Sequence, residues 1–190
     1  MPFAWRASRP PVIDQSQALW GIQKASALLH NDAHTFHKPT HTMLVAPEPT
    51  SVNTAVVHKW YEAIADFDAD ALGALFTEDY VSSMLPKSLG VPDKGKQAGL
   101  DLVKGTASIF EGGKPTKVEV YRFAENAEQV WAHTRLTAKT VTGLTYDAES
   151  IYIFTLEKVE KDPKIKKIAE FADSAYLVKF QSEMAASAKQ

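Results

Sequence analysis

The sequence contains no cysteine, and this absence removes a whole class of chemistry. The chain has no disulfide, no thiolate ligand for a metal ion and no cysteine nucleophile. A chain without cysteine suits a reducing interior, and we expect a cytoplasmic location. The alternative is a mitochondrial transit peptide, suggested by Trp5, Arg6, Arg9 and scattered serines and weakened by Asp14 and the small number of arginines.

An excess of charge of one sign is also missing. The formal net charge is -2 over 190 residues, without a basic tract. We therefore expect neither nucleic acid nor an anionic membrane surface as a partner. No apolar run approaches the roughly 20 residues that cross a bilayer. A chain that is 45% hydrophobic and 23% charged has the composition of one globular domain.

Residues 1–50 differ from the rest because they hold six of the ten prolines. We expect this segment to be flexible or loosely docked, and residues 51–190 to form the domain. Four histidines in the segment have helical spacing that could bind zinc or nickel. However, Pro39 interrupts the helix and carboxylates are not placed as further ligands, so we predict no metal site. These histidines are His30, His34, His37 and His41.

Three helices are predicted at the start of the domain. Apolar residues recur at helical spacing from Val56 to Phe67, and a shorter helix follows Asp68 or Asp70, which can cap it. A third helix spans about residues 96–110, after a loop over residues 86–95 that is broken by proline and glycine. Lysines in and next to this loop indicate solvation, with a lid over a pocket as the alternative: Lys87, Lys94 and Lys96.

Strands dominate the second half of the chain, because the apolar period changes from helical spacing to two. A short strand is expected at residues 80–85, and a closing helix at 174 to about 188. A sheet that is apolar on both faces must be packed against other structure on each face. The helices supply one cover, and a second subunit pairing sheet to sheet would supply the other, so we predict a homodimer. The long strands are predicted at residues 116–123, 129–141, 144–157 and 164–172.

Three stretches give the chain a family resemblance. Residues 57–64 (VHKWYEAI), followed by residues 70–80, resemble two opening helices; residues 138–149 (AKTVTGLTYDAE) resemble a hairpin, and residues 168–176 (IAEFADSAY) a last strand running into a helix. Together they resemble the SnoaL-like branch of the nuclear-transport-factor-two-like superfamily, over about residues 52–186. The resemblance implies an α+β fold: a cone-shaped α+β barrel of three N-terminal helices packed on a strongly curved, mostly antiparallel sheet, with a C-terminal helix.

The resemblance also implies a chemistry. In SnoaL-like cyclases an aspartate near the end of a late strand is the acid/base, and Asp173 resembles it by position. Glu149 is a second candidate for a pocket carboxylate, or else pairs with a lysine. For Asp173 the alternative is a helix cap. Isomerase chemistry through an aspartate in the first strand is not supported, since residues 81–86 contain none, and His133 is expected to face outward.

The expected function is that of a cofactor-free cyclase, isomerase or dehydratase acting on a small hydrophobic carbonyl or polyketide-like compound. The chain has no nucleotide-binding motif. The alternatives are a non-catalytic binding module for a small hydrophobic ligand and a dimerisation module of the same fold. Core packing is the alternative for each expected ligand-binding residue: Trp60, Tyr61, Phe76, Tyr80, Met84, Leu100 and Phe110.

Overall fold

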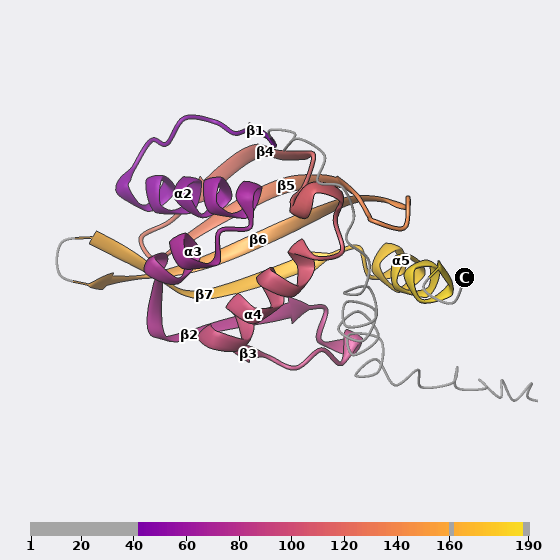
Figure 1. Ribbon diagram of the computed structural model, residues 1–190. Helices are drawn as coiled ribbons and strands as arrows, with labels where there is room; N and C mark the ends of the chain where they lie inside the picture. Colours follow the sequence, from indigo (N-terminus) through magenta and orange to yellow (C-terminus); the bar gives the residue numbers. More distant parts are fainter. Residues whose placement is uncertain (1–41, 160–161, 188–190) are drawn as a thin grey trace, which may run out of the picture.

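The structure, a computed structural model, describes residues 42–159 and 162–187 (Figure 1). Within these residues no helix is both long and apolar enough to span a membrane. The predicted N-terminal histidine cluster lies outside the described residues. In chain order the main elements are β1 (Met43–Val45), α2 (Val52–Asp66), α3 (Ala69–Leu75), β2 (Phe76–Leu85), β3 (Lys94–Gly95), α4 (Lys96–Ala107), β4 (Lys117–Glu125), β5 (Gln129–Lys139), β6 (Thr145–Val159), β7 (Asp162–Ala172) and α5 (Ser174–Ser187).

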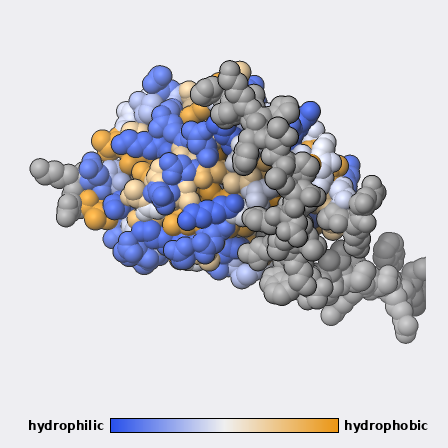
Figure 2. Space-filling model, viewed as in Figure 1, coloured by the Kyte–Doolittle hydropathy of each residue, from blue (hydrophilic) through white to orange (hydrophobic). Residues whose placement is uncertain are grey.

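A single curved sheet carries the fold. Its described strands run in the order β1-β4-β5-β6-β7-β2-β3, and only the β1–β4 and β2–β7 pairs are parallel. Helices α2, α3 and α4 lie on one side of the sheet, and α5 lies at one end (Figure 1). Hydrophilic residues cover much of the helix side (Figure 2). The predicted mostly antiparallel α+β cone is confirmed.

The first helices begin where the sequence supplies caps. Ser51 accepts a hydrogen bond from the Thr54 amide at 3.0 Å, and the Thr54 side chain accepts one from the Ser51 amide at 2.9 Å. Of the two predicted caps for α3, Asp68 is the one used, because its carboxylate accepts from the amides of Asp70 and Ala71. The apolar face of α2, including Trp60, packs against the sheet.

Strand alternation sorts side chains between two faces. On β5 the inward face carries Val130, Ala132 and Thr134, all buried, whereas Trp131 on the outward face is 45% exposed. On β6 Phe154 is buried and Ile151 is exposed. Both strands therefore have one inner and one outer face, as the period of two predicted.

Several boundaries differ from the expectations. Residues 43–45, within the segment expected to be loosely docked, form β1 and extend the sheet by pairing with β4. Strand β2 begins at Phe76 rather than residue 80, because its parallel partner β7 supplies a long edge. Helix α4 ends at Ala107 rather than residue 110, because Phe110 forms a bridge to Thr140 of the β5–β6 turn. These differences arise from contacts between segments far apart in sequence.

The aromatic core over α2 gives a stability prediction. Phe154 is 0% exposed, and its ring lies 5.1 Å from that of Trp60. Phe154→Ala leaves a cavity and should lower the free energy of unfolding by about 3–5 kcal/mol. The measurement is urea unfolding, with the exposed Val141→Ala as a control expected to change stability by about 0.5 kcal/mol or less. Equal effects of the two substitutions would contradict the assigned core.

Candidate active site

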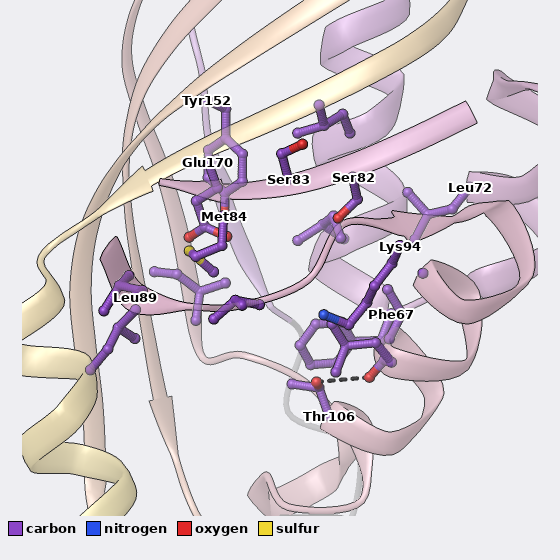
Figure 3. A pocket seen from close by; sticks show the side chains of 18 of the residues that line it. Phe67, Leu72, Ser82, Ser83, Met84, Leu89, Lys94, Thr106, Tyr152 and Glu170 are labelled. Carbon is purple, nitrogen blue, oxygen red and sulfur yellow. Dashed lines mark hydrogen bonds between the residues drawn. The ribbon is translucent and has the colours of Figure 1, made fainter. Parts of the chain in front are cut away.

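A cavity of about 320 Å³ lies between the helices and the inner face of the sheet. Its walls come from α2, α4, the inner faces of β2, β6 and β7, the loop before β3, and α5. Most of the lining is apolar, and a cavity of this volume and character accommodates a small hydrophobic molecule. Figure 3 shows side chains from several of these elements pointing into the same space.

Five of the seven residues expected to bind a ligand line this cavity. Trp60 comes from α2, and Phe76 and Tyr80 stack on each other with ring centroids 3.9 Å apart. Met84 follows on β2, and Phe110 closes the wall near α5. Helical periodicity directs Trp60 inward and strand periodicity directs the β2 residues inward, whereas Phe110 is held by its bridge to Thr140.

The other two residues do not line the cavity. Tyr61 is 1% exposed and packs in the aromatic core, since it is one position further round α2 than Trp60. Leu100 of α4 faces α3, where it packs against Gly73. An ideal Cβ at Gly73 would lie 3.3 Å from a Leu100 methyl group, so this glycine permits the close approach of the two helices. For these two positions core packing is what the structure shows.

Glu170 is the carboxylate that the fold places in the cavity. It lies on β7 beside Met84 of β2 and opposite Tyr152 of β6. The Ser150 hydroxyl donates a hydrogen bond to its Oε1 at 2.9 Å. Among the described residues that line the cavity, no other carries a carboxylate. Figure 3 shows Glu170 and Tyr152 reaching the cavity from adjacent strands, with Met84 close to the carboxylate.

The surroundings of Glu170 change its acidity. Burial, which disfavours the charged form, raises the pKa of Glu170 above its ordinary value of 4.5, although hydrogen bonds from Ser150 and Tyr152 lower it in part. Burial and the negative charge of Glu170 also raise the pKa of Tyr152, so its phenol remains protonated at neutral pH and can donate to the carboxylate. A carboxyl with a raised pKa is a stronger base when it is ionised, so it can take a proton and later return it.

The raised pKa has a consequence for stability. Below about pH 4.5 Glu170 is neutral in the folded and unfolded states, and its contribution to the free energy of unfolding is fully present. This stability is lost as the pH rises through the pKa of Glu170 in the folded state. Glu170→Gln stays neutral at every pH, so at pH 8 it should stabilise the protein by on the order of 1 kcal/mol. At pH 4 the gain should vanish. Thermal unfolding at both pH values tests this, and a variant less stable than the parent at pH 8 would contradict it.

Asp173 lies elsewhere. Its side chain is exposed, outside the cavity lining, and its carboxylate accepts hydrogen bonds from the amides of Ala175 and Tyr176 at 3.0 and 3.1 Å. The predicted alternative, a helix cap at the start of α5, is therefore what the structure shows. The expectation that Asp173 faces the cavity is wrong, because strand alternation turns Phe171 and Asp173 outward. Since α5 contributes Leu177 to the cavity wall, the cap helps to hold that wall.

Glu149 also lies on the outer face. Its side chain is exposed and pairs with His133 of β5, with Nε2 and Oε2 3.4 Å apart. The expected lysine partner is thus a histidine, and a position in the pocket is wrong for the same reason of alternation. His133 faces outward as predicted, with its ring 4.8 Å from that of Tyr121.

Sequence reasoning missed Glu170 because β7 is apolar on both faces. Ile168 and Ala172 face inward, while Ala169 and Phe171 lie on the other face, so alternation alone does not say which set is inside. A bulge near Lys166 also shifts the register between β6 and β7. One signal was available: Glu170 is a lone charge within the apolar run Ile-Ala-Glu-Phe-Ala, and a charge in such a run indicates a special environment.

A single cation accompanies the carboxylate in the lining. Lys94 of β3 reaches the cavity, and it is the only lysine or arginine among the described lining residues (Figure 3). Burial lowers the pKa of Lys94, although the nearby Asp93 raises it in part. In the described part of the chain, no three histidine, aspartate or glutamate side chains are grouped as metal ligands would be.

Solved structures with the same fold come from several sources. The BvnE pinacolase from Penicillium brevicompactum is 23% identical with a TM-score of 0.61, over 73% of this chain and 97% of that chain. PrhC from Penicillium brasilianum is 18% identical with a TM-score of 0.59, over 73% and 95%. TerC, co-crystallised with polyporic acid, is 14% identical with a TM-score of 0.58, over 70% and 99%. These similarities establish the fold.

The sequence itself matches a known family. No curated protein matches this chain by sequence. The profile of the SnoaL-like domain matches residues 57–167, from the apolar face of α2 to the middle of β7. This match covers more than half of the chain and includes most of the elements that form the cavity, so the protein belongs to the SnoaL-like domain family.

Proposed function

We propose that the protein is a general acid–base enzyme of the isomerase or cyclase type, which needs no cofactor and acts on a small hydrophobic carbonyl compound. The observation that carries the proposal is Glu170, a deeply placed carboxyl with a raised pKa in the wall of an apolar cavity. Carboxyl groups whose pKa is shifted by burial inside a cavity are typical of functional sites. The burial of Glu170 therefore favours a chemical role.

The proposed chemistry begins with a ketone bound in the cavity next to Glu170. The ionised carboxylate takes a proton from the carbon next to the carbonyl, and the electrons of that C–H bond form the enolate. The enolate carbon then attacks an internal carbonyl, or the protonated Glu170 returns the proton at another carbon. In either case the proton is conserved, and the product is an isomer of the substrate or its cyclised form. Apolar walls such as Trp60 and Phe110 exclude water.

Solved structures of other proteins with the same fold support the proposed class of reaction. They include a pinacolase, a protein described as a polyketide cyclase and one described as an isomerase, at 23%, 17% and 16% identity. TerC, which has the same fold, was co-crystallised with polyporic acid. Identities this low leave the substrate open. The support therefore extends to a cyclase or isomerase type of reaction and stops there.

Proton exchange tests the proposal without knowledge of the natural substrate. The protein is incubated in D₂O with 2-tetralone, a two-ring ketone of suitable size, and mass spectrometry follows deuterium entering next to the carbonyl. We expect exchange well above that in buffer or with unfolded protein. If 2-tetralone binds without accelerated exchange, the catalytic proposal is contradicted and a non-catalytic binding module is the better description.

We also propose a homodimer formed through the outer face of the sheet. Apolar side chains stand exposed there on three adjacent strands, with Trp131, Ile151 and Phe171 at 45%, 41% and 51% exposure. The same face carries His133 and Arg135 on β5 beside Asp147 and Glu149 on β6. A two-fold axis can place the basic strand of one copy over the acidic strand of the other, so the face is complementary to itself.

A further inference from the structure

The ammonium of Lys94 interacts electrostatically with the adjacent Asp93 but is not bonded to any described side chain. It lines the cavity from β3 and takes part in no ion pair or side-chain hydrogen bond there. Asp93, the adjacent carboxylate, is engaged with Lys87 instead. A cation withdrawn from water is unfavourable unless it meets an opposite charge. Lys94 is thus a partly buried charge in the wall of an apolar cavity, and it forms no salt bridge with a described residue.

Two nearby lysines, unlike Lys94, form salt bridges. Lys96 binds Glu78 at 2.7 Å, and Lys166 of β7 bridges Asp79 and Glu157. These pairs lie outside the cavity lining. Lys96 and Lys166 thus have carboxylate partners outside the cavity, whereas Lys94, which reaches the cavity, forms no salt bridge with a described residue. A methionine or leucine at position 94 would suit an apolar wall better, so the ammonium has a purpose that packing does not explain.

Glu170 does not supply the missing charge. The two groups form no ion pair, and the pKa of Glu170 is governed by burial, Ser150 and Tyr152 rather than by Lys94. Besides Glu170, Lys94 is the one residue with a carboxylate, ammonium or guanidinium group among the described lining residues. The cavity thus has an apolar body, a proton-exchanging carboxyl and a separate positive charge.

We propose that Lys94 binds an anionic oxygen of the ligand, so that the compounds taken up are hydrophobic acids: an apolar ring system bearing a carboxylate or an ionised enol. The inference rests on the proposed function for its site, and it adds the charge of the substrate. The ammonium orients the acid, and the apolar body fills the space between Lys94 and Glu170. An ionic contact in an apolar cavity is stronger than one in water.

Two fluorescent dyes with one skeleton test the inference by binding alone. 8-Anilinonaphthalene-1-sulfonate is an anion, and N-phenyl-1-naphthylamine is the same ring system without the charge. Lys94→Met keeps the length of the side chain. It should weaken binding of the anionic dye about tenfold and leave binding of the neutral dye unchanged. Lys94→Arg should retain most of the affinity for the anion. Met84→Trp, which fills the cavity, should weaken both dyes.

Lys104→Met is the matched control, because Lys104 is exposed on α4 and outside the cavity lining. It changes net charge equally and should affect neither dye. The proposal would be overturned if the parent and Lys94→Met bound the anionic dye with equal affinity. It would also be overturned if Lys94→Met lost affinity for both dyes to the same extent. Because these are binding measurements, loss of the Lys94 effect and absence of proton exchange with 2-tetralone are separate results.

Discussion

Glu170→Gln should lower the rate of proton exchange into 2-tetralone about 10³-fold, which is within the range for loss of a general acid–base group. Glutamine has nearly the same shape and can still accept a hydrogen bond from Ser150, so the fold should be retained. Its amide cannot take a proton from carbon. Deuterium incorporation measured by mass spectrometry gives the rate, and circular dichroism shows that the fold is intact.

Asp173→Asn is the matched control for this substitution. Asparagine caps a helix about as well as aspartate, so α5 and its share of the cavity wall should stay in place. We expect a rate within about twofold of the parent, because Asp173 is exposed and outside the cavity lining. The opposite pattern, with a loss in Asp173→Asn and none in Glu170→Gln, would restore the assignment that the sequence suggested and reject the one argued from the structure.

The rate should also depend on pH in a way that identifies Glu170. Only the ionised form acts as a base, so exchange should rise as the pH passes through the raised pKa of this group, above 4.5. Over the same interval the stability contributed by Glu170 is lost. Opposite trends of activity and stability in one pH interval indicate a group whose position serves chemistry rather than folding.

Phe171→Glu should convert a dimer into a monomer at micromolar concentration. Phe171 is 51% exposed in the middle of the apolar outer face, next to Ile151 of β6. In a two-fold dimer the substitution occurs twice, and each new carboxylate would be buried without a partner. Unpaired charges at an interface weaken association by several kcal/mol, so the dissociation constant should rise at least about 100-fold. Light scattering after size exclusion gives the mass.

Val141→Glu is the control for the dimer, since Val141 is 50% exposed but lies in the β5–β6 turn, away from the outer-face patch. The same charge there should leave the mass of the assembly unchanged. A parent protein that is monomeric at high concentration would contradict the proposal. Something other than a second copy would then cover the outer face of the sheet. An unchanged mass in Phe171→Glu would place the interface elsewhere.

Local pattern was enough to predict most elements. The helical spacing of Val57, Trp60 and Tyr61 identified α2, and strict alternation identified β5, because each pattern reflects one buried face. The boundaries that failed depend on partners distant in sequence. Strand β1 exists because β4 offers a parallel edge, and the bulge near Lys166 depends on how β6 and β7 are aligned. Neither feature has a local signature.

The sequence by itself determined the α+β cone and the family, because amphipathic periodicity reflects buried faces, and it named five residues that line the cavity, with core packing as the alternative for each. The tertiary structure alone decided which acid lies inside. On β7 both faces are apolar, and a shift of one residue exchanges Glu170 for Phe171. Only the register of β7 against β2 and β6 resolves that choice, because it places Glu170 opposite Tyr152 in the cavity and leaves Asp173 outside to cap α5.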